Sequence, residues 1–274
     1  MSFLKHIFAG VTALALTVTA AAAADRAKLQ AFMQVTGFDV ALDSLRLSAS
    51  QAPALLGLSE ENFGEDWTRL ADEIFASEGL RSDALDILEQ TMDDEMLNHA
   101  AAFYASDLGQ RLVEAENASH MDDSEESDLV GEELAAELIE DGSPKIEYFR
   151  DMSRAIGSIE NSIRSITEVQ VRFLMSAQAA GLVEADWDED ELRAILLSRA
   201  AEMEQAMIIG GITGSAWTYR DFSDDDMKAY LEALEEPLMQ KVYELMNAVQ
   251  FQLQAQRFEE LAGRMVDLYP QQDI

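Results

Sequence analysis

The sequence predicts an all-α fold made of two similar helical halves, with no significant sheet. Only 4 prolines interrupt long stretches of Ala, Leu, Glu, Asp and Met, which are mostly good helix formers. Apolar residues recur at three- and four-residue steps, whereas Val, Ile and Thr rarely alternate with polar residues as they would in a strand. Hydrophobic residues make up 48% of the chain, which is enough to bury a core, so we do not expect disorder.

Residues 1–24 have the layout of a secretory signal peptide. Lys5 precedes an apolar run over residues 7–18, and small residues over 20–24 lead to Asp25. We expect cleavage before Asp25 and export to the periplasm as a soluble protein. An uncleaved anchor is the alternative, because the apolar run is nearly long enough to span a bilayer, but no basic cluster flanks it.

Residues 25–120 are expected to form the first helical half. Apolar residues spaced for one helical face start near Leu29 and continue past Gly37. We expect Ser59 to cap the next helix and Gly79 to end it. A further apolar stripe follows at helical spacing: Met92, Met96, Ala100, Phe103, Tyr104, Leu108, Leu112 and Ala115.

Residues 121–142 read as an acidic linker that contains a short helix over residues 129–139, and residues 143–274 are expected to form the second helical half. The linker begins with the acidic, helix-poor run MDDSEESD. Helices of the second half are expected to start where capping residues precede apolar periodicity: at Ser143–Pro144, Asp188, Ser223 and Pro237.

We interpret the two halves as an internal duplication. Residues 93–115 align with residues 224–246 at a constant offset. In this alignment Ser106 falls on Pro237, and both residue types mark a helix start, one position out of register. Identity is low, and helical periodicity alone produces chance matches of this kind, so the alternative stays open.

Residues 103–112, FYASDLGQRL, follow an F-Y-x-S-x-x-G-x-x-L pattern through Phe103, Tyr104, Ser106, Gly109 and Leu112. With these features, and over residues 28–115, the chain resembles a bacterial domain-of-unknown-function family of exported helical proteins. The second half fits only as a diverged copy. The resemblance implies an all-α envelope protein with no established activity. Physically, we expect the motif to be structural: aromatics in the core, a serine cap and a glycine that admits a neighbouring helix closely.

Charge and composition exclude several classes of function. The chain has 19 basic and 53 acidic residues and a net charge of −34 at pH 7, so it should repel nucleic acids and anionic lipids. No apolar run after the leader is long enough to insert into a membrane. The absence of cysteine excludes disulfides, lipid attachment through cysteine and cysteine nucleophiles. No nucleotide-binding glycine loop, H-E-x-x-H or G-x-S-x-G pattern is present, and we expect no cofactor.

Met92, Met96 and His99 fall at i, i+4 and i+7, on one face of a predicted helix. Thioether and imidazole ligands suit Cu(I), so a metal-handling role is a minor hypothesis. Core packing is the leading interpretation, because methionine commonly fills irregular cores.

The segment over residues 210–223, GGITGSAWTYRDFS, is predicted to be non-helical, because two glycines begin it and end the preceding helix. An aromatic and basic loop on an acidic protein is a natural place for a contact with a ligand or partner. The alternative is that its aromatic side chains fold back onto the core. The candidate contact residues are Trp217, Tyr219 and Arg220.

Taken together, these features favour a non-catalytic periplasmic binding or interaction protein, with an unidentified protein or small molecule as partner. The first alternative is a hydrolase that uses paired carboxylates, which would need a deep pocket holding two acids with raised pKa values. The second alternative is the metal-handling protein.

Overall fold

The computed structural model describes residues 26–58, 65–122 and 124–268, and over these ranges the chain is helical with no strand. The predicted all-α fold class is therefore confirmed. The predicted signal peptide, its cleavage site before Asp25 and the predicted Ser59 cap lie outside the described residues.

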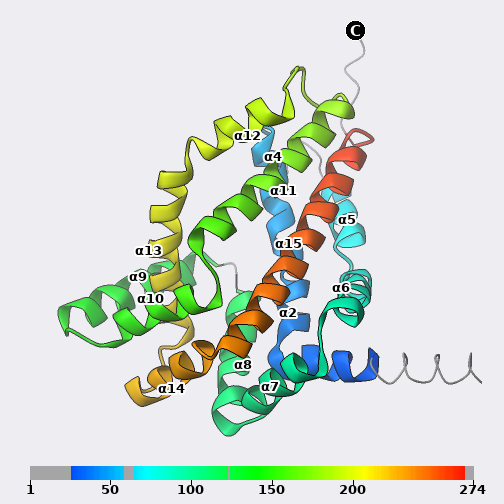
Figure 1. Cartoon of the computed structure of the whole chain (residues 1–274). Coiled ribbons are helices and arrows are strands. Elements are labelled where there is room, and N and C mark those ends of the chain that lie inside the picture. Colours follow the sequence, from blue (N-terminus) through cyan, green and yellow to red (C-terminus); the bar gives the residue numbers. More distant parts are fainter. Residues whose placement is uncertain (1–25, 59–64, 123, 269–274) are drawn as a thin grey trace, which may run out of the picture.

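The helices follow one another with short connections (Figure 1). After a first helix over residues 26–36, they are α2 (Phe38–Asp43), α3 (Leu45–Ser48), the 3-10 turn η1 (Ala49–Gln51), α4 (Ala52–Leu55), α5 (Glu65–Ile74), α6 (Ser77–Thr91), α7 (Asp94–Tyr104), α8 (Asp107–His120), α9 (Glu125–Glu140), α10 (Lys145–Ile156), α11 (Ile159–Ala179), α12 (Glu189–Leu197), α13 (Ala200–Thr218), α14 (Asp224–Leu234) and α15 (Pro237–Met265). The short pieces α2 to α4 line up as one column (Figure 1).

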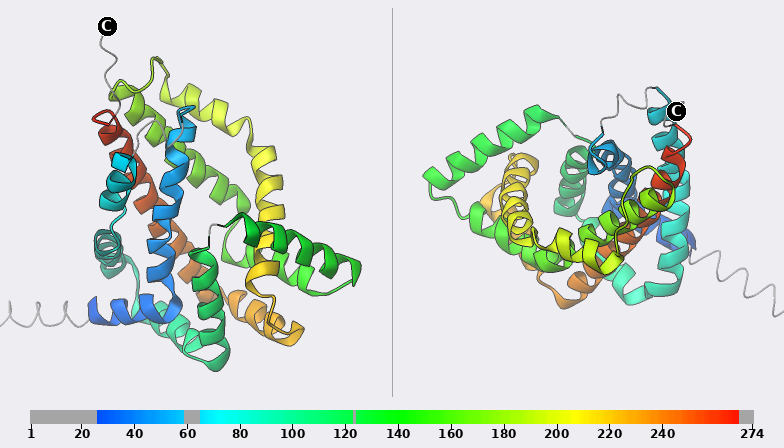
Figure 2. Two further views of the ribbon diagram at one scale, coloured as in Figure 1. Left: turned by 180° about the vertical axis from the view of Figure 1, so that it is seen from behind. Right: turned by 90° about the horizontal axis from the view of Figure 1, so that it is seen from above.

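The long helix α15 is the centre of the packing. It contacts α5, α6, α7, α10, α11 and α14, and it runs beside α11 in both Figure 1 and Figure 2. Phe258 of α15 packs edge-on against Phe75 and Phe173, with ring centroids 5.9 and 5.8 Å apart. Burying such aromatic side chains supplies much of the stability of a core that has no covalent cross-link.

A second group of helices forms around α13, which contacts α8, α9, α10 and α11. Gly131 brings α9 very close to α13, because a Cβ atom at this position would lie 2.7 Å from the carbonyl oxygen of Thr213. Only a glycine permits backbones to approach this closely.

Two predicted helix ends at glycine are wrong. Gly79 lies inside α6, and Gly210 and Gly211 lie inside α13. A glycine in a helix costs about 1 kcal/mol relative to alanine, and the packing of α13 against its neighbours offsets this cost. The predicted helix from Asp188 instead breaks between α12 and α13, at Ser198 and Arg199.

The predicted acidic linker over residues 121–142 is mostly one helix of the fold. Ser124 caps α9, since its Oγ accepts a hydrogen bond from the backbone N–H of Ser127 at 3.3 Å. Acidic residues that were predicted to be loop, such as Glu125 and Glu126, therefore occupy the first turn, where carboxylates interact favourably with the helix dipole. The predicted short helix over residues 129–139 is therefore present but begins earlier, at Glu125, because the acidic run marks a helix start.

Capping residues place the other helix starts as predicted. Asp188, Ser106 and Ser223 each accept a hydrogen bond from a backbone N–H of the first turn, and Pro237 is the first residue of α15. At α10 the oxygen of Ser143 accepts from the N–H of Lys145 at 3.3 Å, so the helix begins one position later than expected.

The helix boundaries agree with the proposed alignment of the two halves. The pair α7 and α8 starts at Asp94 and Asp107, and the pair α14 and α15 starts at Asp224 and Pro237, with the same spacing. A duplication would produce this agreement, and the duplication itself stays a prediction.

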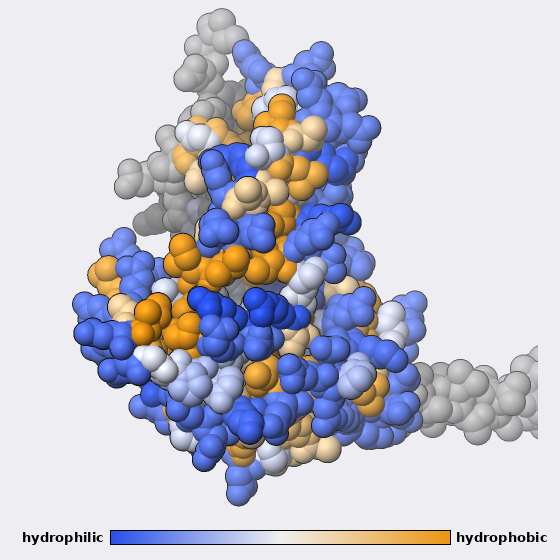
Figure 3. All heavy atoms as spheres, turned by 60° about the vertical axis from the view of Figure 1, so that its left-hand side comes forward, coloured by the Kyte–Doolittle hydropathy of each residue, from blue (hydrophilic) through white to orange (hydrophobic). Residues whose placement is uncertain are grey.

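Among the described helices, none has both the length and the apolar character needed to cross a bilayer. Some large apolar side chains are nevertheless exposed on α9, α12 and α13, namely Leu129, Ile139, Ile195, Leu197 and Ile209. Figure 3 shows the face that includes α12 and α13, where apolar side chains gather near the middle and hydrophilic ones surround them.

Candidate ligand-binding cavity

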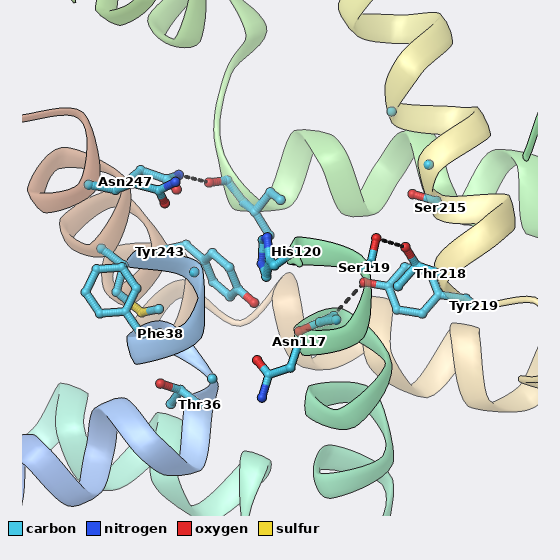
Figure 4. Close-up of a pocket in the computed structure, with 18 of the residues that line it drawn as sticks. Thr36, Phe38, Asn117, Ser119, His120, Ser215, Thr218, Tyr219, Tyr243 and Asn247 are labelled. Atoms are coloured by element: carbon cyan, nitrogen blue, oxygen red, sulfur yellow. Dashed lines mark hydrogen bonds between the residues drawn. The ribbon is translucent and has the colours of Figure 1, made fainter. Parts of the chain in front are cut away.

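A cavity of about 380 Å³ lies between the first two helices, α8, α13 and α15. Its volume falls at the lower end of the range for small-molecule sites, about 300–1,000 Å³. Figure 4 shows side chains from these separate helices converging on the cavity. Polar groups that line it include Glu116, Asn117, Ser119, His120, Thr218 and Tyr243.

Glu116 of α8 is the acidic residue of the cavity lining. One of its carboxyl oxygens, Oε1, accepts hydrogen bonds from the hydroxyl groups of Tyr219 at 2.7 Å and Tyr230 at 2.8 Å. The other oxygen, Oε2, makes no hydrogen bond to the described residues and is not sealed from solvent. Oε1 is thus held by the two tyrosines, whereas Oε2 can accept a hydrogen bond from a ligand.

Three tyrosine hydroxyls form a cluster next to this carboxyl group. The hydroxyl of Tyr230 lies 3.3 Å from that of Tyr104 and 3.2 Å from that of Tyr243. The hydroxyls of Tyr104 and Tyr243 are also hydrogen-bonded to each other. Phe103 stacks on Tyr230 with ring centroids 5.8 Å apart. Shared hydrogen bonds and ring packing hold the tyrosines in place before any ligand arrives.

Burial controls the protonation of these groups. It raises the pKa of Glu116, while the hydrogen bonds from Tyr219 and Tyr230 act in the opposite direction. Burial also raises the pKa of the Tyr219 and Tyr230 hydroxyls well above the ordinary value, so both remain donors at neutral pH. Desolvation lowers the pKa of His120, which is therefore neutral at pH 7.

Glycines of α13 form one wall of the cavity. Gly210, Gly211 and Gly214 all line it, and a Cβ atom added at any of them would meet no other atom within 4 Å. The space beside this stretch of helix is therefore open. A larger side chain at one of these positions would occupy part of the cavity.

Gly37 lies at the opposite side, in the turn between the first helix and α2. Its φ of 73° favours glycine, and a Cβ atom here would lie 2.5 Å from Oδ1 of Asn117. That oxygen is buried and makes no hydrogen bond to the described residues. The turn thus fits tightly against α8 beside the cavity.

The predicted contact residues at positions 217–220 lie in different environments. Trp217 belongs to the last turn of α13, so the predicted loop is largely helical. Tyr219 is buried, and its hydroxyl group donates a hydrogen bond to Glu116 of the cavity lining. Arg220 instead stacks on Trp217, with its guanidinium carbon 3.8 Å from the ring centroid, and both line a neighbouring hollow. A ligand or partner contact at these residues stays a prediction.

Met92, Met96 and His99 do not share one helical face. Met92 follows the end of α6 with an extended backbone, and Asp93 then caps α7, so the helix is interrupted between the two methionines. His99 pairs with Glu236 at 3.2 Å. Among the described residues, no group of three or more histidine, aspartate or glutamate side chains is placed to hold a metal ion.

The residues of the F-Y-x-S-x-x-G-x-x-L pattern lie at the corner between α7 and α8. Tyr104 and Leu112 are buried, Phe103 is half-buried, and Ser106 caps α8 by accepting from the N–H of Gly109 at 3.1 Å. A Cβ atom at Gly109 would lie 2.3 Å from the carbonyl oxygen of Phe103. These residues pack and cap the corner, and Tyr104 also belongs to the hydroxyl cluster.

Sequence reasoning missed Glu116, because it is one of 53 acidic residues. A usable signal was present, since Glu116 follows the buried Leu112 by four positions and so lies on the same side of α8. An acidic residue on an apolar face indicates a buried charge. Tyr230 and Tyr243 carry no local signal that distinguishes them from the apolar residues packed around them in α14 and α15.

A family model described as an uncharacterized protein conserved in bacteria (DUF2059) matches residues 78–141. This supports the expected similarity to a bacterial domain of unknown function. The matched segment contains Tyr104 and Glu116, while the other three tyrosines lie outside it. No curated protein and no solved structure matches the chain.

Proposed function

We propose that this chain is a non-catalytic binding protein of the bacterial cell envelope, which holds a small organic ligand in the cavity at Glu116. One observation carries the proposal: a carboxyl oxygen with no hydrogen-bond partner among the described residues belongs to a group that lines a cavity of about 380 Å³. Concave sites with a few converging polar groups are typical of small-molecule binding.

The location in the periplasm rests on the sequence of residues 1–24, which have the layout of a cleavable leader. The absence of cysteine also removes any dependence of the fold on the redox state of the compartment.

Binding without catalysis is favoured by the number of acids in the cavity. Acid–base hydrolysis of the glycosidase type needs two carboxyl groups about 5–9.5 Å apart on either side of the bond that breaks. Glu116 is the one carboxylic residue among the described residues that line this cavity. The paired-carboxylate hydrolase is therefore our second choice.

The test is to fill part of the cavity with a larger side chain in place of a glycine of α13. We expect a panel of small amines, alcohols, amides and carboxylates to contain compounds that raise the melting temperature of the wild-type protein. In Gly214→Leu, the new side chain occupies the open space beside α13, and these shifts should disappear. The variant should remain folded, because leucine is a better helix former than glycine by about 0.8 kcal/mol.

Ala206→Leu is the matched control, because Ala206 is exposed on the same helix and does not line the cavity. This variant should keep the ligand-induced shifts of the wild type. If no compound of the panel raises the melting temperature, or if Gly214→Leu responds as the wild type does, the proposed function is wrong.

A further inference from the structure

We infer that the cavity takes a small organic cation, a protonated amine, with Glu116 as its counter-ion. This inference rests on the proposed function and names the chemical class of the ligand. It follows from the charge of the groups around Glu116, from the way its carboxyl group is held and from the aromatic side chains beside it.

Glu116 has no cationic partner among the described residues. The two groups that hydrogen-bond to it are neutral tyrosine hydroxyls, and no lysine or arginine lines the cavity. A carboxylate removed from bulk water is costly unless a positive charge or further hydrogen bonds compensate it. The site therefore has one acidic group and, among the described residues, no cation that would balance its charge when it ionises.

One oxygen of the carboxyl group is held by the protein, and the group itself lines the cavity. Tyr219 and Tyr230 both donate to Oε1, whereas Oε2 has no hydrogen-bond partner among the described residues. An ammonium group supplies both a positive charge and N–H donors for Oε2, and such charge-assisted hydrogen bonds are the stronger ones. A carboxylate or phosphate ligand would instead meet a like charge.

The other lining groups do not oppose a cation. His120 is the imidazole of the lining, and desolvation lowers its pKa, which favours its neutral form. Phe38 and Tyr243 present aromatic rings at the cavity, as Figure 4 shows. Aromatic rings attract organic cations through their electron-rich faces. The net charge of −34 adds a field that draws cations to the whole molecule.

A bare metal ion fits this site less well. Calcium requires six to eight oxygen ligands, usually from several carboxylates, and no cluster of three or more acidic or histidine side chains is placed to hold a metal among the described residues. One carboxylate with hydroxyl donors and aromatic neighbours matches an amine better.

The test compares three probes of similar shape: phenethylamine, phenethyl alcohol and 3-phenylpropanoate. Titration calorimetry on the full protein at pH 7 should give phenethylamine a dissociation constant about tenfold or more below that of the alcohol. The propanoate should bind more weakly still. In Glu116→Gln, which removes the charge and keeps the shape, phenethylamine should lose about tenfold or more of its affinity.

Glu114→Gln is the matched control. It removes the same charge from the same helix, but Glu114 is exposed and does not line the cavity. Its affinity for phenethylamine should stay within about twofold of the wild type, because salt largely screens the charge of a solvent-exposed side chain. An equal loss in both variants would mean that the overall charge attracts the amine, and the inference would be wrong.

The two proposals fail in different ways. If phenethyl alcohol binds as tightly as phenethylamine, and Gly214→Leu abolishes both, the cavity binds ligands and only the assignment of a cation is overturned. If Glu116→Gln binds phenethylamine as the wild type does, the counter-ion role is overturned. If none of the probes and no compound of the wider panel binds, both proposals fall together.

Discussion

At the scale of single residues, the carboxyl group of Glu116 shows how burial and hydrogen bonding act against each other. Burial disfavours its charged form, whereas donation from Tyr219 and Tyr230 favours that form. The result is a raised pKa, so burial is the stronger effect. Such a group lowers the stability of the folded protein and is typical of a site kept for binding rather than for folding.

The raised pKa predicts how stability depends on pH. The native state holds the proton of Glu116 more tightly than the unfolded state, whose pKa is about 4.3. The contribution of Glu116 to the free energy of unfolding therefore falls as pH rises from about 4 through its native pKa. Glu116→Gln removes this cost, so urea denaturation should show it gaining stability relative to the wild type between about pH 4 and pH 7.

Glu73→Gln should show the opposite trend. A hydrogen bond from Arg264 lowers the pKa of Glu73, so this carboxylate stabilises the native state above its unfolded pKa and loses that effect as pH falls. The variant should lose stability relative to the wild type as pH rises. A relative stability of Glu116→Gln that does not change with pH would contradict the cost that we assign to Glu116.

At the scale of helices, the corner between α7 and α8 depends on the absence of a side chain. The chain turns so sharply at Ser106 that Gly109 lies against the last turn of α7. The same turn directs Tyr104 toward the hydroxyl groups of Tyr230 and Tyr243. The corner therefore positions one tyrosine of the cluster beside the cavity.

Gly109→Ala should destabilise the protein by about 2 kcal/mol or more, because the rigid backbone of α7 cannot yield to the new methyl group. The nearest atom would be the carbonyl oxygen of Phe103 at 2.3 Å. Gly79→Ala is the matched control, since its Cβ atom would meet only Arg257 Nη2 at 3.6 Å. Chemical denaturation should show this variant unchanged or more stable by up to about 1 kcal/mol. Equal stability of the two variants would mean that the corner can open.

Helix starts could be predicted well from the sequence, because a cap is a local interaction. Each helix start is set by residues of its own first turn, as at Ser106, Ser223 and Pro237. The neighbouring sequence therefore contains the whole signal. Helix ends at glycine could not be predicted reliably. The continuation of α13 through Gly210 depends on contacts with α9, a helix far away in the sequence.

The cavity could not be predicted as a whole, because no local pattern marks it. Glu116, Tyr219, Tyr230 and Tyr243 come from separate helices and from both halves of the chain. Each residue is ordinary in its own helix, and only the tertiary fold brings the hydroxyls to the carboxyl group. The prediction that Met92 and Met96 share one helical face was wrong for the converse reason. A helix break at Asp93 separates two residues that their spacing in the sequence places on one face.

At the scale of the whole molecule, negative charge is the dominant electrostatic feature. The 53 acidic residues greatly outnumber the 19 basic ones, so repulsion between carboxylates acts over much of the molecule. Ion pairs such as Arg81 with Asp43 and Arg264 with Glu73 link separate helices, but exposed pairs contribute at most about 1 kcal/mol each.

Salt should therefore stabilise the protein. Raising sodium chloride from about 0.01 M to about 0.15 M shortens the screening length from about 30 Å to about 8 Å. Repulsion between acids on different faces then weakens, and the melting temperature measured by circular dichroism should rise. A falling melting temperature would mean that attraction within the ion pairs exceeds repulsion among the remaining carboxylates.

The central place of α15 bears on when the fold can form. This helix touches members of both halves, and it is the last one described along the chain. The earlier helices expose the apolar surfaces that α15 covers until residues 237–265 have been synthesised, so the core cannot close before this segment is present.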